Sequence, residues 1–395
     1  MSKGLKTALT LLLLAAFGGA LFFALRGQKA EVAQKAENAE AAAAGAITGL
    51  IALDVEPYFA DGRVQKILAD KRLSVQTTRV GSRDMAGKLI AAAATDAGGK
   101  SVPDFLFPSG VVAANQITDA ARKANINTSQ SSPFFTPMVI ASWTPIAKIL
   151  VANGVAKHLG ERIYGVDMTK LTSLMLAKKR WKDLQGASGY DVSRSVLVST
   201  TDVRRSNSAA MYLALTSQAI HGDIVTDHAS AQAVSAKVAE LFKRQGYQEN
   251  YVNGNFDDYV SIGIGKTPMA FLYENQMVQF ALSKKGAGAD ASGGVGIGVG
   301  KDMVLMYPQP TIVNKVVFVA VSERARKLAE LLATNAELQR IAVEFGFRIA
   351  DSGVFMKAVQ PTGLAVEERL TQVVDPPSFE IMLEMIDAVS KELTQ

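Results

Sequence analysis

The sequence predicts an α/β protein of two lobes with a cleft between them, preceded by one N-terminal transmembrane helix. From Ile47 onward, short β-branched runs alternate with helical stretches. Two apolar, extended runs have the character of crossings between lobes, and a long uncharged run precedes the alternating region. The 395 residues are 48% hydrophobic and 20% charged, a globular composition with room for two domains.

The individual elements follow from residue type and periodicity. Strands are expected where runs are short and rich in β-branched or aromatic residues, at residues 47–53, 73–80, 103–110, 136–143, 195–200, 267–277 and 314–322. Helices are expected at residues 58–71, 85–94, 111–123, 144–154, 171–186, from 207 onward, 323–334, 335–346 and 378–393. The last helix, within 376–395, is expected to pack on the outside through apolar residues at helical spacing: Phe379, Met382, Ile386 and Val389.

The runs TPMVIASW (136–143) and NKVVFVAV (314–321) are the expected crossings. A chain that leaves one lobe and later returns needs such a pair, and the stretch between them has the size of a domain. We therefore expect lobe 1 to comprise residues 47–140 with 312–375, and lobe 2 to comprise residues 141–311. Periodicity alone leaves one continuous sheet as an alternative.

Residues 1–26 predict a membrane anchor. The run from Thr7 to Leu25 has no charge, and about 20 apolar residues span a bilayer as a helix. A cleaved signal peptide has an apolar core of only about 7–15 residues, although a long cleaved signal remains the alternative. We expect a single-pass protein of the cell membrane, with its globular part in the periplasm or at the cell exterior. Residues 27–46, rich in Ala, Glu and Lys, are expected to form a helical linker.

The composition and the motifs argue against several classes of function. There is no cysteine, which removes thiol catalysis, disulfides and thiolate metal sites. The net charge of +5 comes from scattered residues without a basic, aromatic-rich patch, so no nucleic-acid partner is expected. HGDIVTDH (221–228) matches no common zinc spacing, and SIGIGKTP (261–268) has Val260 where a phosphate loop needs its first glycine. The sequence nominates no catalytic set, cofactor or metal, so an enzyme is not expected.

Small polar clusters follow three predicted strands, each where a helix begins: Gly81–Ser82–Arg83, Ser109–Gly110 and Ser206–Asn207–Ser208. Ligands of open α/β sheets bind at the carboxyl ends of strands, and N–H groups at helix starts receive anions. Ordinary N-capping explains a single cluster, whereas three clusters in two lobes favour a shared cleft. The expected ligand-binding residues are Ser82, Arg83, Ser109, Gly110, Thr201, Ser206, Asn207, Ser208, Tyr273 and Glu274.

The expected charges of this cleft depend on Glu274. A buried carboxylate repels an anion unless it is protonated or paired, for instance with Arg83 or Arg205. Arginines beside a helix start can equally point to water. An unpaired Glu274 would favour a cationic or amine-bearing ligand over an oxyanion.

Four segments resemble the type II periplasmic solute-binding proteins, especially the phosphate- and molybdate-binding kinds, over about residues 47–360. They are KRWKDLQG (179–186), STTDVRRSNSA (199–209), FLYENQ (271–276) and LQRIAVEFGFR (338–348), and their order along the chain carries the resemblance. Ala209 departs from it, standing where a glycine is common, and so does the predicted anchor.

The resemblance implies a bilobed receptor that binds a small anionic or polar ligand and presents it to the permease of an ABC importer or to another membrane protein. The alternative is a membrane-tethered sensor or scaffold that uses the same fold to contact protein partners.

Overall fold

The computed structural model describes residues 45–95, 102–246, 248–250, 252–286 and 302–394. The predicted anchor at residues 7–25 and nearly all of the linker at 27–46 lie outside the described residues. Among the helices that the structure does describe, none combines the length and apolar character needed to cross a bilayer.

One lobe is built on a parallel sheet in the order β2-β1-β3, which β9 joins in the antiparallel sense. Its strands are β1 (Ile47–Ile51), β2 (Val75–Arg79), β3 (Phe105–Phe107) and β9 (Thr311–Ala320). Its helices are α2 (Glu56–Ala60), α3 (Gly62–Asp70), α4 (Met85–Thr95), α5 (Val111–Lys123), α12 (Glu323–Thr334) and α13 (Ala336–Glu344).

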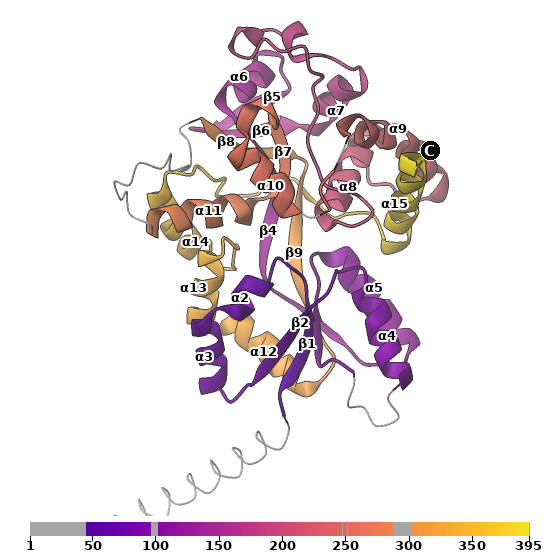
Figure 1. Ribbon diagram of the computed structural model, residues 1–395, viewed down its shortest axis with the longest axis vertical. Helices are drawn as coiled ribbons and strands as arrows, with labels where there is room; N and C mark the ends of the chain where they lie inside the picture. Colours follow the sequence, from indigo (N-terminus) through magenta and orange to yellow (C-terminus); the bar gives the residue numbers. More distant parts are fainter. Residues whose placement is uncertain (1–44, 96–101, 247, 251, 287–301, 395) are drawn as a thin grey trace, which may run out of the picture.

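The other lobe contains a mixed sheet with helices around it (Figure 1). Its strands are β5 (Ala156–Gly160), β6 (Ile163–Asp167), β7 (Met269–Tyr273) and β8 (Met303–Gln309). Its helices are α6 (Thr144–Ala152), α7 (Met168–Leu176), α8 (Asn207–His221), α9 (His228–Gln245), α10 (Val252–Ser261) and α15 (Phe379–Thr394). Between the lobes lie α11 (Glu274–Gly286) and α14 (Ser352–Val359).

A single long strand, β4 (Ser129–Trp143), belongs to both lobes. Residues 129–137 pair with β9, whereas residues 138–143 pair with β7 and β8. Figure 1 shows β4 and β9 side by side along the junction of the lobes. The two-lobed α/β architecture expected from the sequence is therefore present. The shared strand also joins the sheets of both lobes into one hydrogen-bonded sheet of ten strands, in which β7 and the short β10 (Val373–Val374) branch off beside β4 and β9.

Five predicted elements differ from the structure, and one of them, the strand 136–143, is only the second half of the longer β4. The expected helix 58–71 is two helices, because the Asp61 carboxylate caps α3 by accepting from Arg63 N. The expected helix 171–186 ends at Leu176, after which Lys178 adopts a positive φ of 56°. The expected strand 195–200 is an extended segment held by isolated bridges, from Ser195 to Arg180 and from Ser199 to Ala270. The expected strand 267–277 ends at Tyr273 because α11 begins at Glu274.

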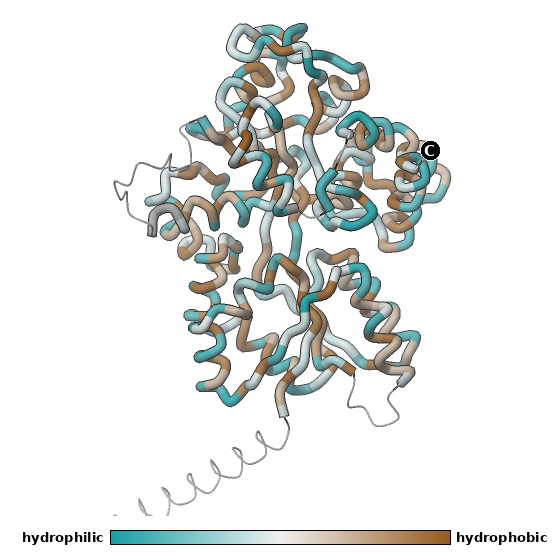
Figure 2. Tube along the Cα trace, in the orientation of Figure 1, coloured by the Kyte–Doolittle hydropathy of each residue, from teal (hydrophilic) through white to brown (hydrophobic). Residues whose placement is uncertain are grey.

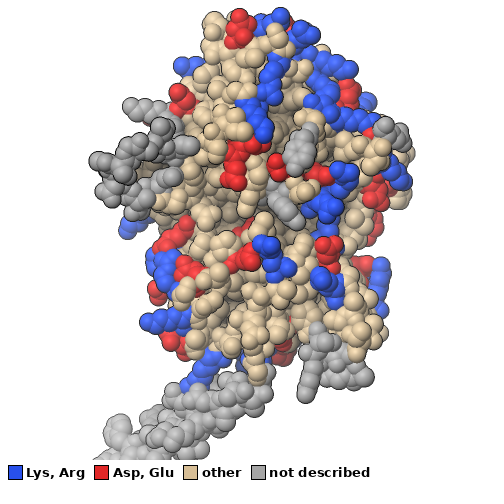
Figure 3. Space-filling view, viewed as in Figure 1, with Lys and Arg blue, Asp and Glu red and all other residues tan. Residues whose placement is uncertain are grey.

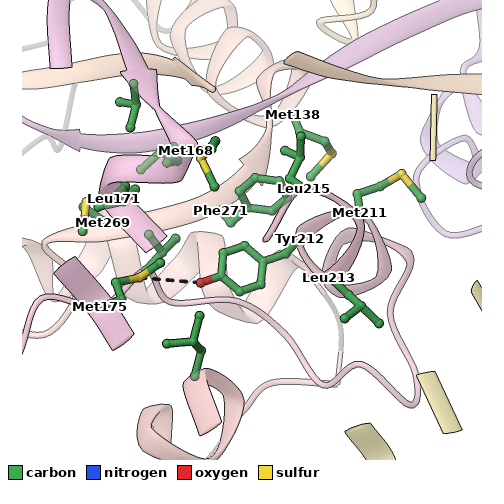
Figure 4. Close-up of a cluster of buried hydrophobic side chains, with 14 of the residues drawn as sticks. Met138, Met168, Leu171, Met175, Met211, Tyr212, Leu213, Leu215, Met269 and Phe271 are labelled. Carbon is green, nitrogen blue, oxygen red and sulfur yellow. Dashed lines mark hydrogen bonds between the residues drawn. The ribbon is translucent and has the colours of Figure 1, made fainter. Parts of the chain in front are cut away.

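Methionines fill much of the core of the second lobe. Met138, Met175, Met211 and Met269 come from four different elements and surround the aromatic pair Tyr212 and Phe271 (Figure 4). Tyr212 is fully buried and donates its hydroxyl to Met175 Sδ at 3.7 Å. Unbranched methionine side chains fill irregular spaces, which suits a core assembled from several elements. Figure 2 shows the hydrophobic segments concentrated on the central strands and on the inner sides of the helices.

The C-terminal helix α15 packs against α9 and α8 and also touches α5 of the other lobe. Met382, Ile386 and Val389 are buried as expected, together with Ile381 and Met385. The helix is therefore not only an outer cover. It is part of the second lobe, and it reaches the junction with the first.

A buried ion pair joins α11 to the segment after α13. Glu274 is fully buried, and its Oε1 and Oε2 accept from Nε and Nη2 of Arg348, each at 2.9 Å. Tyr307 of β8 donates to the same carboxylate at 3.0 Å. Burial lowers the pKa of the Arg348 guanidinium, but the charge and hydrogen bonds of Glu274 outweigh it, so this pKa is raised overall. The backbone of Arg348 exchanges two hydrogen bonds with Phe135 on β4, which ties the pair to the shared strand.

Arg348→Met is expected to destabilise the protein by about 3–5 kcal/mol, because it leaves the Glu274 charge buried without its partner. Adding Glu274→Gln removes that charge and keeps an acceptor for Tyr307, so the double variant should recover more than half of the loss. Urea denaturation of the three proteins measures this. Equal instability of the single and the double variant would show that the charge is not the cause.

Candidate functional site

A cavity of about 540 Å³ lies between the lobes, and it is called the interlobe cavity here. Lobe 1 contributes residues that follow the carboxyl ends of its three parallel strands, and lobe 2 contributes the start of α8 and the end of β7. The polar and charged lining residues are Asp54, Arg79, Ser82, Arg83, Ser109, Gln116, Arg205, Ser206, Asn207, Asn253 and Tyr273. Parallel strands place their carboxyl ends at one edge of the sheet, which brings distant polar residues together.

Two helices begin at this cavity without a side-chain cap. In α5 the N-cap residue is Gly110, which has no side chain, and in α8 it is Ser206, whose hydroxyl accepts no hydrogen bond from the helix within the described chain. The hydroxyl of Ser206 bonds instead to Ser208 Oγ at 2.9 Å. The first N–H groups of a helix have no partner inside the helix and carry partial positive charge. Two such helix starts, one from each lobe, favour a bound anion.

Side chains connect the lobes around the cavity. Arg83 Nη2 of lobe 1 donates to the carbonyl oxygen of Ser206 in lobe 2, at 3.5 Å. Asn207 Nδ2 donates to Tyr273 Oη at 3.0 Å and to Asn314 Oδ1 on β9 at 3.3 Å. These two hydrogen bonds hold the start of α8 against β7 and β9.

Two guanidinium groups line the cavity without an ion-pair partner among the described residues, those of Arg83 and Arg205. Burial lowers the pKa of Arg83, although the negative charges of Asp202, Asp387 and Asp84 act in the opposite direction. Arg204, next to Arg205 in the chain, is exposed as Arg205 is, but its guanidinium group binds the carboxylate of Asp202 at 2.6 Å. Figure 3 shows acidic and basic side chains interspersed over both lobes on the face in view.

One carboxylate of the site was not among the predicted residues. Asp54 follows β1 at the same edge of the sheet, and its Oδ1 accepts from Ser109 Oγ at 2.6 Å. Ser109 N in turn donates to Ser82 Oγ at 2.9 Å. Burial raises the pKa of Asp54, and the Ser109 hydrogen bond partly offsets that rise. The signal was available in the sequence, because Asp54 ends a predicted strand as Ser82 and Ser109 do.

An apolar wall completes the cavity, and sequence reasoning missed it as well. Phe379, Leu383 and Ile386 of α15 line one side, and Val112, Ala113 and Ala210 add apolar surface from α5 and α8. Their helical spacing indicated a buried face, but spacing alone does not say that the face borders a cavity.

The predicted site residues are placed in three groups. Ser82, Arg83, Ser109, Ser206, Asn207 and Tyr273 line the interlobe cavity. Thr201 and Ser208 lie beneath it, fully buried, with their hydroxyls 2.8 Å apart. Gly110 is not among the lining residues; it follows Ser109 in the chain and is the N-cap of α5.

Glu274 differs from the expectation. It points away into the buried pair with Arg348 rather than closing the cleft with Tyr273, and neither Arg83 nor Arg205 is its partner. Successive side chains of an extended chain point to opposite faces, so Tyr273 at the end of β7 and Glu274 at the start of α11 do not face the same cavity.

Gly110→Ala is expected to destabilise the protein by about 1–3 kcal/mol, because the φ of 86° and ψ of 158° belong to a region that is essentially restricted to glycine. A Cβ there would also stand 2.8 Å from Asn314 Oδ1 and 2.9 Å from the Asn207 amide.

The control for that variant is Gly87→Ala, inside α4, where a Cβ meets nothing within 4 Å. This change should stabilise by up to about 1 kcal/mol, as alanine does in a helix interior. Thermal unfolding compares the two, and a tolerated Gly110→Ala would contradict the strained position.

Comparison with known proteins gives a likeness in structure only. No protein-family model matches the sequence, and no curated protein matches it. Among solved structures, the apo ferric ion-binding protein A of Pasteurella haemolytica is similar, with a TM-score of 0.51 at 11% identity over 88% of this chain and 96% of that one. An ABC transporter structure from Clostridium perfringens gives 0.51 at 10% identity, covering 88% and 98% of the two chains. The ferric binding protein of Campylobacter jejuni gives 0.50 at 10% identity, with the same coverage. The chain therefore has the two-lobed α/β fold of periplasmic binding proteins.

Proposed function

We propose that this chain is a solute-binding protein that holds a small organic anion in the interlobe cavity. The observation that carries the proposal is the meeting of two uncapped helix starts with the guanidinium groups of Arg83 and Arg205 at one cavity. Groups of this kind bind anionic oxygens with charge-assisted hydrogen bonds. Ser82, Ser109, Ser206 and Asn207 add neutral hydrogen-bonding groups to the same site.

The cavity supports a ligand larger than a bare oxyanion. A volume of about 540 Å³ falls within the range of about 300–1,000 Å³ that is usual for sites of drug-sized ligands. The wall of Phe379, Leu383 and Ile386 suits an apolar body. Asp54 repels a purely anionic ligand when it is ionised, but it accepts a hydrogen bond from a hydroxyl or amine. We infer an anionic head at the helix starts, an apolar body at α15 and a donor facing Asp54.

The cellular role is proposed from the fold together with the sequence. Similar structures are named as ferric ion-binding proteins or as part of an ABC transporter. We propose delivery of the solute to an ABC importer from outside the cytoplasm, with residues 7–25 as a membrane anchor. The described residues include no group of three or more His, Cys, Asp or Glu side chains able to hold a metal, and the proposed ligand is an organic anion.

Arg205→Gln should weaken binding of a matching anion about tenfold to a hundredfold, since a hydrogen bond to a charged group is worth about 1.5–3 kcal/mol. Ser206→Ala with Asn207→Ala should cost several kcal/mol, at about 1–3 kcal/mol for each partner lost. Arg204→Gln is the adjacent control and should leave binding unchanged, because Arg204 does not line the cavity.

The measurement is a thermal-shift screen of carboxylates, phosphate esters, sugars and amino acids, followed by calorimetry of the hits on all four proteins. If no small molecule raises the melting temperature of the wild type, solute binding fails and a scaffold role takes its place.

Binding should depend on pH through Asp54. Because its pKa is raised above 3.8, the carboxyl stays neutral to a higher pH than usual and gains its charge as the pH rises through the raised value. A ligand with only anionic groups should then bind more weakly at higher pH, whereas a ligand that donates to Asp54 should keep its affinity. Calorimetry across this pH range with Asp54→Asn as the control separates the two. An Asp54→Asn protein with the wild-type pH profile would contradict the assignment.

A further inference from the structure

A second cavity, of about 520 Å³, lies in the second lobe and shares no lining residue with the interlobe cavity. Its walls come from the extended segment 194–200, the end of α9, α10 and the turn before β7. Its lining residues include Arg194, Thr200, Arg244, Gln245, Glu249 and Lys266.

Three polar atoms on these lining residues are buried and have no hydrogen-bond partner in the described structure: Thr200 Oγ1, Gln245 Nε2 and Arg244 Nη2. Thr200 is only 2% exposed, so its hydroxyl is withdrawn from bulk water. A buried polar group normally finds a partner, and an unpaired one calls for an explanation such as a bound ligand. All three atoms are able to donate, so the missing partner is an acceptor.

The donors are held in place by the surrounding structure. Gln245 Oε1 accepts from Thr200 N at 2.8 Å, which fixes the Gln245 amide next to the Thr200 hydroxyl. Arg194 Nη1 donates to the carbonyl oxygens of Gly265 and Lys266, at 2.6 and 3.1 Å. Arg244 Nη1 donates to the carbonyl oxygen of Met175 at 2.5 Å. Ser199 Oγ donates to Asn255 Oδ1 at 2.7 Å, so the cavity wall is tied to α10.

The charges of the cavity also favour an anion. Lys266 and Asp258 neutralise each other in a pair at 2.7 Å. The remaining charged lining residues are two arginines, Arg194 and Arg244, against one carboxylate, Glu249. The cavity therefore offers one net positive charge together with hydroxyl and amide donors.

We propose that this second cavity binds a small oxygen anion, such as a carboxylate or sulfate-like group, through Thr200, Gln245 and the two guanidinium groups. Nothing in the interlobe cavity requires this site. The two sites are adjacent along the chain, because the segment 199–207 contributes Ser199 and Thr200 to the second cavity and Arg205 to Asn207 to the interlobe cavity.

The test uses sulfate, phosphate and acetate as probes. It compares the wild-type protein with a background variant, Arg83→Gln with Arg205→Gln, in which anion binding at the interlobe cavity is weakened. In that background at least one probe should still bind by calorimetry and raise the melting temperature. Thr200→Val and Gln245→Leu, each added to it, should weaken that binding at least tenfold. Thr200→Val should not lower the melting temperature without probe, because the hydroxyl that it removes has no partner among the described residues.

Thr172→Val is the matched control. Thr172 is 1% exposed and its hydroxyl also lacks a partner in the described structure, but it lines neither cavity. This variant should keep probe binding. The proposal is overturned if the background protein binds no probe, or if Thr200→Val and Gln245→Leu bind as well as Thr172→Val does. If the background protein binds the probes as tightly as the wild type does, this result counts against anion binding in the interlobe cavity and not against the second cavity.

Discussion

The structure depends on one constraint, that the strand β4 is shared by both lobes. Half of its length pairs with β9 and the other half with β7 and β8, so neither lobe has a complete sheet without it. Polar groups secure the strand where it changes sheets. Thr136 accepts from Asn275 N at 3.0 Å, and Phe135 is bonded to Arg348, whose side chain meets Glu274. A buried pair of this kind is weak evidence for stability, but losing one partner is costly, so the crossing is built from groups that depend on one another.

The helices that begin at the interlobe cavity, close to this crossing, can be compared with the other helices by their N-terminal caps. Helices α3, α7, α9, α12, α13 and α14 each have an N-cap side chain that accepts from the helix. The helices α2, α5, α6 and α8 have none; of these, α5 and α8 begin at the interlobe cavity, where Gly110 has no side chain and Ser206 is a residue type that caps well. Replacing a capping serine by alanine costs about 0.5–2 kcal/mol, whereas a glycine at the same position costs only a few tenths. At the start of α8 the Ser206 hydroxyl bonds to Ser208 instead of capping the helix, so the first N–H groups of α8 are left for another acceptor.

Much of this arrangement follows from local sequence, and the rest does not. The strand ends before Ser82, Ser109 and the start of α8 at Asn207 were predictable, because residue type and periodicity act over a few neighbours. Glu274 was misplaced, because one residue decides whether a chain continues as a strand or starts a helix, and Arg348, its partner, is 74 residues away. The apolar wall from α15 was also beyond reach. Its spacing indicates a buried face, but which surface it meets is set by packing against α9 and α5.

The segment STTDVRRSNS connects these observations. Its first residues face the second cavity, its middle is fixed by the Arg204–Asp202 pair and by Thr201 bonded to Ser208, and its last residues open α8 at the interlobe cavity. Coupling between two binding sites is reciprocal, because each ligand changes the affinity of the other by the same factor. An anion at Thr200 that moved this segment would therefore alter solute affinity at Asn207, and the solute would alter anion affinity equally. The many small polar residues of STTDVRRSNS, just before α8, then contribute to two cavities rather than one.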